Sequence, residues 1–144
     1  MKKREFWLVV FTGGIVYCFI EILWRGYTHW SMALLGALCF CSFYYLEPKL
    51  SHINFFLRML LLCALVTAYE FCFGVVFNLL LGYNVWDYSD LRINFMGQIS
   101  LLYSFFWYLL CILSHFLRKL MKERIFDVLP DTAGVVPKLG KVKS

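Results

Sequence analysis

The sequence predicts an all-α membrane protein, a bundle of four transmembrane helices. Of its 144 residues, 62% are hydrophobic and only 16% are charged, and the mean hydropathy is +0.71. A soluble domain of this length has roughly 25% charged residues, so the excess apolar side chains are expected to face lipid. Four apolar segments are long enough to cross a bilayer, and the basic residues are distributed unequally around them. Together these observations argue against a soluble globular domain.

The candidate spans follow from the length that a bilayer requires. About 20 mostly apolar residues cross the hydrocarbon core, because a helix rises ~1.5 Å per residue. The first segment is expected to remain as a permanent helix, since it is too long for a cleaved signal peptide and carries Glu21. The four predicted spans are residues 6–24, 30–46, 55–81 and 96–116.

The chain divides into a membrane domain and a polar C-terminal part. Residues 1–118 form the predicted four-helix transmembrane domain. Residues 119–144 begin with a basic stretch that continues the fourth helix, and from residue 127 they contain Pro and Gly without apolar periodicity. This pattern predicts a basic cytoplasmic extension followed by a disordered tail.

The basic residues predict the orientation. With four spans both termini lie on one side, and that side then holds 12 of the 14 Lys and Arg residues, with only Arg25 and Arg92 opposite. Lys and Arg are retained in the cytoplasm during insertion. We therefore expect a multi-pass protein of the cell membrane with both termini in the cytoplasm. No basic stretch lies away from the membrane flanks, so the lipid bilayer is the expected partner and nucleic acid is not.

A weak internal repeat is visible. Phe6 opens the first span and Phe55 the third, and Glu21 and Glu70 each follow 15 residues later. Each glutamate leads through a polar turn to a returning span. The spacing raises the hypothesis of two tandem helical hairpins in the same orientation.

Glu21 and Glu70 are the most informative residues. A carboxylate inside a span costs about 2.5 kcal/mol or more to insert, so such residues usually face the bundle interior and act there. Fifteen residues place each glutamate ~22 Å along its helix, in the outer part of the hydrocarbon core. Arg25 follows Glu21 by four residues and can pair with it. A structural alternative stays open, in which the glutamates only fix helix packing.

Other polar residues gather at the same outward side. Asn94 is a plausible N-cap of the fourth helix, with Gln98 in its first turn. An acidic, partly desolvated pocket would favour cations or the ammonium group of a zwitterion. The Trp86–Asp90 stretch also fits a simple turn with an interfacial aromatic anchor. The predicted ligand-binding residues are Glu21, Arg25, His29, Glu70, Asn78, Trp86, Asp87, Tyr88, Asp90, Asn94 and Gln98.

A search for sequence motifs of catalysis or cofactor binding finds none of the common ones. The sequence has no P-loop, GxSxG, HExxH or CxxC pattern, so no cofactor is predicted. His29 has no partner at a metal-ligand spacing, so no metal site is predicted. If the protein is an enzyme, Glu21, Glu70 and Asp87 are the candidates for acid/base chemistry on a lipid.

Three strings around these residues resemble a known family. They are Glu21-Ile-Leu-Trp-Arg-Gly-Tyr-Thr-His-Trp-Ser-Met32, Thr67-Ala-Tyr-Glu-Phe-Cys-Phe-Gly-Val-Val-Phe-Asn78, and Trp86-Asp-Tyr-Ser89 followed by Asn94-Phe-Met-Gly-Gln-Ile99. Over roughly residues 6–118 the chain resembles the CmpB-like family of small integral membrane proteins catalogued as "putative ABC-transporter type IV". Glu47 also resembles a family position, whereas Leu35-Gly36-Ala37 replaces an expected glycine pair. The resemblance implies a link to transport and association with a separate ATPase or another membrane subunit.

Three functions remain open. The first is a permease-like or channel-like protein that binds a small polar solute or cation in an outward-facing pocket. Four helices rarely enclose a polar path alone, so a homo-oligomer, most simply a dimer, is expected. The second is a membrane-embedded enzyme that acts on a lipid or lipid-linked substrate through Glu21 and Glu70. The third is a structural or regulatory membrane subunit.

Overall fold

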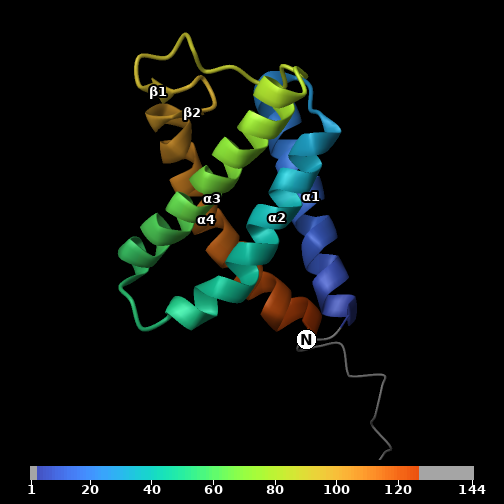
Figure 1. The fold of residues 1–144 in the computed structure, drawn as a ribbon. Coiled ribbons are helices and arrows are strands. Elements are labelled where there is room, and N and C mark those ends of the chain that lie inside the picture. The colour runs from blue at the N-terminus through green and yellow to red at the C-terminus, as the bar shows by residue number, and fades with distance from the viewer. Residues whose placement is uncertain (1–2, 127–144) are drawn as a thin grey trace, which may run out of the picture.

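The computed structural model describes residues 3–126 and has four long helices joined by short connections (Figure 1). In chain order they are α1 (Lys3–Arg25), α2 (Trp30–Leu46), α3 (Phe55–Phe73) and α4 (Leu101–Met121). Four helices, counted with the helical turns that continue them, are long and apolar enough to cross a membrane. The predicted fold class, an all-α bundle with four candidate spans, is confirmed. The tail predicted from residue 127 lies outside the described residues.

The bundle has two different ends. The loop side carries the turn between α1 and α2 and residues 81–100. The terminus side carries the start of α1, the 3-10 turn η1 (Glu47–Leu50) and the π-helix η3 (Lys122–Phe126) that continues α4. Which side faces the cytoplasm, and whether the two hairpins are repeats, remain predictions.

Local sequence signals explain where the first helices begin and end. Gly26 ends α1 at a φ of 82°, a left-handed conformation that glycine adopts without strain. His29 caps α2, because its Nδ1 accepts a hydrogen bond from the backbone N–H of Ser31 at 3.2 Å. Pro48 ends the regular turns of α2 and lies in the first turn of η1. Asn54 caps α3 by accepting from the N–H of Phe56 at 3.0 Å.

The third span changes its winding near the loop side. After Phe73 the helix continues as the π-helix η2 (Gly74–Leu80). The N–H of Leu81 donates to the carbonyl of Val76, five residues earlier, at 3.0 Å. Such π segments are rare and often occur at functional sites. The predicted extent of the third span, residues 55–81, therefore agrees with α3 plus η2.

The prediction for the start of the fourth span was wrong. Residues 94–100 do not begin a helix but form a small antiparallel hairpin, β1 (Asn94–Phe95) and β2 (Ile99–Ser100). Met96 and Gly97 make its turn at φ values of 55° and 70°. Two successive residues in the left-handed region are incompatible with a right-handed helix. The helix therefore starts at Leu101, five residues later than expected.

The same hairpin corrects the roles of Asn94 and Gln98. Asn94 is not the N-cap of α4; its Oδ1 accepts from the N–H of Gly97 at 3.0 Å and so closes the hairpin turn. Ser100 is the N-cap, accepting from the N–H of Tyr103 at 3.2 Å. Gln98 lies in the hairpin rather than in the first turn of α4.

Glycines bring α1 and α2 into close contact. A Cβ built on Gly13 would lie 2.6 Å from Cβ of Phe40, and one built on Gly36 would lie 2.4 Å from Cβ of Tyr17. Small residues at such a contact let two helix backbones approach closely in a membrane. The first hairpin is therefore a tightly packed pair that fixes Tyr17 and the rest of α1.

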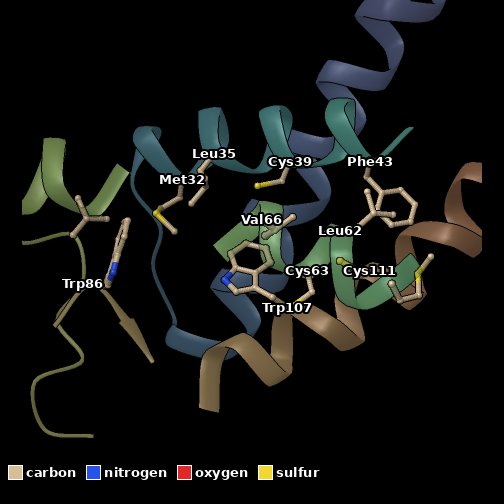
Figure 2. Packing of buried hydrophobic residues seen from close by; sticks show 12 residues of the cluster. Met32, Leu35, Cys39, Phe43, Leu62, Cys63, Val66, Trp86, Trp107 and Cys111 are labelled. Carbon is tan, nitrogen blue, oxygen red and sulfur yellow. The ribbon is translucent and has the colours of Figure 1, made fainter. Parts of the chain in front are cut away.

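A second contact region holds α2, α3 and α4 together. Figure 2 shows Trp107 of α4 among Cys39 of α2 and Val66 and Cys63 of α3. By contrast, Phe11, Ile15 and other large apolar side chains of α1 are exposed, as expected for a surface that faces lipid. The buried core residues of this cluster are Met32, Leu35, Cys39, Phe43, Met59, Leu62, Cys63, Val66, Val85, Trp86, Trp107 and Cys111.

The two outer helices α1 and α4 separate toward the loop side. At the terminus side Lys122 Nζ lies 3.0 Å from Glu5 Oε1, which joins the end of α4 to the start of α1. Toward the loop side the ribbons of α1 and α4 diverge (Figure 1). This divergence makes room for the cavity described next.

Candidate functional site

A cavity of about 600 Å³ lies near the loop side, with α1 and α4 as its two main walls. Glu70 of α3 also lines it, and so do residues 84–88 of the loop after η2, which we call the covering loop. We call it the loop-side cavity. Its lining residues are Tyr17, Ile20, Glu21, Trp24, Arg25, Tyr27, Met32, Glu70, Asn84, Val85, Trp86, Asp87, Tyr88, Tyr103, Phe106, Trp107, Leu109, Leu110 and Leu113.

The cavity brings together six of the eleven residues that the sequence singled out as ligand-binding candidates. Those six are Glu21, Arg25, Glu70, Trp86, Asp87 and Tyr88. The other five do not line this cavity. They are His29, Asn78, Asp90, Asn94 and Gln98.

Glu21 and Arg25 form the ion pair that their spacing suggested. Arg25 Nη2 lies 2.5 Å from Glu21 Oε1. Glu21 is buried, and its Oε2 accepts from the hydroxyl of Thr28 at 3.2 Å. Arg25 Nη1 donates to the carbonyl of Val85 at 3.0 Å. The pair therefore neutralises Glu21 and also ties the end of α1 to the covering loop.

Glu70 has no cationic partner in the described part of the chain. Only 2% of its surface is exposed. Its Oε1 accepts from the hydroxyl of Tyr88 at 2.9 Å, whereas Oε2 is buried without a hydrogen bond of good geometry. The indole of Trp107 is the other polar neighbour. Burial and the Glu70 carboxylate raise the pKa of the Tyr88 hydroxyl, so Tyr88 stays protonated and donates.

Asn78 and Gln98 hold the covering loop from behind. Asn78 Nδ2 donates to Gln98 Oε1 at 2.9 Å, and Asn78 Oδ1 accepts from the N–H of Val85 at 2.7 Å. The indole N–H of Trp86 donates to the carbonyl of Gln98 at 2.9 Å. A Cβ on Gly74 would come within 2.6 Å of Gln98 Oε1. The lack of a side chain at Gly74 therefore lets Gln98 pack against η2.

The acidic loop residues differ in their positions. Asp87 lies at the rim of the cavity, and its Oδ1 accepts from the hydroxyl and the N–H of Ser89. These two hydrogen bonds hold the pKa of Asp87 below its usual value, so it is ionised at neutral pH. Asp90 is exposed on the loop away from the cavity. His29 is used as the cap of α2.

Comparison with known proteins identifies the family. Residues 7–138 match the family model described as "Putative ABC-transporter type IV", the CmpB family. The chain belongs to this family. No curated protein and no solved structure gave a significant match. The CmpB family is a transporter-related membrane family by this description, which agrees with the four helices that can cross a membrane.

In this CmpB family member, sequence reasoning missed the aromatic walls of the cavity. Tyr17 stacks on Trp107 with ring centroids 5.3 Å apart, and Tyr88 stacks on Tyr103 at 4.4 Å. Tyr17 precedes Glu21 by one helical turn, so its place was readable from the sequence. The aromatic face of α4 has a helical spacing as well, but nothing in the sequence indicates that it faces α1 rather than lipid.

A second polar cluster, on the terminus side, was also missed. Glu47 is buried, with 4% of its surface exposed. Its carboxylate lies 3.0 Å from Arg58 Nε, 3.2 Å from His115 Nδ1 and 3.3 Å from Arg118 Nη1. The cluster joins the end of α2 to α3 and α4. It lies on the terminus side of this CmpB protein, opposite the loop-side cavity.

Across residues 3–126, no group of three or more His, Cys, Asp or Glu side chains could hold a metal ion. The cysteines in this range are free, and Cys39, Cys63 and Cys111 are buried in the core. The chemistry that the cavity offers therefore comes from carboxylates, hydroxyls and aromatic rings.

Proposed function

We propose that this protein is a permease-like membrane component that binds a small cation or cationic solute in the loop-side cavity. The observation that carries the proposal is Glu70, a buried carboxylate with an unsatisfied oxygen, in the wall of a cavity of about 600 Å³. A carboxylate in the membrane is costly and usually marks a substrate or ion pathway. Family membership in a transporter-related group supports the same assignment.

The charge of the lining favours a cation over an anion. Arg25 is already paired with Glu21, which leaves Glu70 and Asp87 as the two carboxylates without a cationic partner in the cavity wall. The Tyr88 hydroxyl satisfies one oxygen of Glu70 without adding charge. A cation that enters would gain the attraction of both carboxylates in a partly desolvated site.

Further components follow from this proposal. The sequence has no P-loop, so ATP-driven transport would need a separate ATPase subunit. The Glu47 cluster ties α2, α3 and α4 together on the terminus side, away from the loop-side cavity. A second copy of the chain is the simplest way to complete a polar path. The dimer and the ATPase subunit are parts of the proposal.

The first prediction concerns orientation. We expect the loop side to face outward and the terminus side to face the cytoplasm, because 12 of the 14 Lys and Arg residues then lie inside. In a variant without native cysteines, Asp90→Cys should react with a membrane-impermeant thiol reagent in intact cells. The matched variant Ser51→Cys, on the exposed terminus-side connection, should react only after the cells are opened. The reverse pattern would overturn the orientation.

The second prediction tests Glu70. Glu70→Gln keeps the size of the side chain and removes its charge. We expect the variant to fold and to lose at least about tenfold in affinity for the stabilising cation, equivalent to about 1.4 kcal/mol. The measurement is thermal unfolding of the purified protein against a panel of inorganic cations, amino acids and alkylated amines.

The matched control for this test is Asp90→Asn, which removes a carboxylate that does not line the cavity. It should respond to each cation as the parent does. A Glu70→Gln variant that keeps the parent's response to every stabilising cation would leave Glu70 with a packing role only.

A further inference from the structure

The loop-side cavity has many aromatic rings in its wall. Tyr17, Trp24, Tyr88, Tyr103, Phe106 and Trp107 all contribute to its wall. Trp24 and Phe106 meet edge to face across the gap between α1 and α4, with ring centroids 5.4 Å apart. Aromatic rings attract cations through their negative faces, and alkylated ammonium groups are bound by aromatic cages in this way.

The acceptors in the cavity are already largely used. Glu21 accepts from Thr28 through Oε2 and faces Arg25 through Oε1, and Glu70 Oε1 accepts from Tyr88. Glu70 Oε2 is the buried carboxylate oxygen that remains. A primary ammonium group has three N–H donors, whereas Glu70 Oε2 is a single buried carboxylate oxygen without a hydrogen bond. A trimethylammonium group has no N–H donors, so one carboxylate and several aromatic rings are enough to bind it.

A small metal ion fits less well for the same reason. Ca²⁺ takes six to eight oxygen ligands and Mg²⁺ takes six. The described residues contain no group of acidic side chains that could supply them. The lining therefore selects for a large, weakly hydrated organic cation.

Two residues of the cavity lining are also exposed on the surface of the bundle. Leu109 and Leu113 of α4 belong to its lining, and 47% and 49% of their surfaces are exposed. Leu113 lies 12 residues after the first residue of α4, or ~18 Å along the helix, which reaches the middle of a ~30 Å hydrocarbon core. An apolar chain attached to the cation could lie along Leu109 and Leu113 in contact with lipid.

We propose that the loop-side cavity binds an amphiphile that carries a trimethylammonium-type headgroup. The headgroup lies among the rings beside Glu70, and the acyl chain leaves between α1 and α4. The inference rests on the proposed function, in that both use the same cavity, but it specifies the class of ligand and its route of entry.

The test uses the full-length protein in maltoside micelles, which contain no choline. The probes are a short-chain phosphatidylcholine, the phosphatidylglycerol of the same chain length, and choline chloride. The readout is the concentration of each probe that raises the thermal unfolding midpoint. We expect phosphatidylcholine to act at lower concentration than choline, and phosphatidylglycerol to have no specific effect.

Matched variants connect the effect to the cavity. Phe106→Leu removes a lining ring, whereas Phe116→Leu removes a ring of the same helix that is exposed and lies outside the cavity. Phe106→Leu should weaken the response to phosphatidylcholine by about tenfold, and Phe116→Leu should leave it unchanged. Glu70→Gln should weaken it at least as much, and Phe106→Leu provides an independent arm if Glu70→Gln does not fold.

The other outcomes overturn defined parts of the inference. Equal action of phosphatidylglycerol, or equal loss in the two Phe variants, would exclude a headgroup site in this cavity. If choline raised the unfolding midpoint at the same concentration as phosphatidylcholine, the ligand would be a water-soluble cation. The proposal that the ligand is an amphiphile would then be wrong. If an inorganic cation or an amino acid stabilises through Glu70 and no quaternary ammonium does, this inference fails and the proposed function stands. If no probe depends on Glu70, both fail.

Discussion

Glu47→Gln should lower the free energy of unfolding by about 3 kcal/mol or more, the largest effect that we expect from a single polar substitution. The carboxylate of Glu47 is surrounded by Arg58, His115 and Arg118, all within 3.3 Å. Removing one partner of a buried ion pair leaves an uncompensated buried charge, which typically costs about 3–5 kcal/mol. Here the neutral amide would leave two guanidinium groups next to each other.

The measurement is reversible unfolding in mixed micelles, with Glu123→Gln as the matched control. Glu123 is an exposed carboxylate on η3, and its substitution should change the free energy of unfolding by less than about 0.5 kcal/mol. Adding Arg118→Leu to Glu47→Gln should recover part of the loss, because one of the unpaired cations is then removed. Equal stability of Glu47→Gln and Glu123→Gln would mean that the cluster does not hold the terminus side together.

Gly36→Ala should destabilise the protein by about 2 kcal/mol although it adds only one methyl group. The new Cβ would lie 2.4 Å from Cβ of Tyr17 and 3.0 Å from the carbonyl oxygen of Gly13. Neither atom can move away easily. The Cβ of Tyr17 carries a ring that stacks on Trp107, and the oxygen of Gly13 belongs to the backbone. Overpacking of this kind costs about 1–3 kcal/mol, and it would outweigh the gain of about 1 kcal/mol in helix propensity.

Gly14→Ala is the matched control for this prediction. It makes the same substitution in the same helix pair, but the nearest atom to its new Cβ is the carbonyl oxygen of Ala33 at 3.2 Å. We expect its free energy of unfolding to stay within about 1 kcal/mol of the parent. If the two variants lost the same free energy of unfolding, the closer contact at Gly36 would not be what limits the separation of α1 and α2. Gly36→Ala should also weaken ligand binding, since Tyr17 lines the cavity.

The fold was largely predictable because hydropathy and short spacings are local signals. The apolar runs identified four helices, and the four-residue spacing of Glu21 and Arg25 identified their ion pair. The error at the fourth span has the same origin. Residues 96–100 directly precede the apolar run that starts at Leu101, so the sequence predicts them as its first turn. The left-handed conformations of Met96 and Gly97, which prevent a helix there, are visible only in the backbone.

The site was less predictable because its contacts are distant in the sequence. Tyr88 reaches Glu70 across 18 residues, and His115 reaches Glu47 across 68 residues. No spacing rule connects such pairs. Asn78 and Gln98 lie outside the loop-side cavity. Their polar character indicated a ligand site, whereas they bond to each other and hold the covering loop.

The two membrane carboxylates also differ in when they acquire a partner during biosynthesis. Glu21 is neutralised by a residue of its own helix, one turn later, so the α1–α2 hairpin leaves the ribosome with its charge already compensated. Glu70 receives its hydroxyl donor only after another 18 residues have been made, and its aromatic neighbour Trp107 comes later still. The first hairpin is thus a self-sufficient unit for the insertion machinery, whereas the second depends on the whole chain. A nascent chain that ended before Tyr88 would therefore carry Glu70 without its hydroxyl donor.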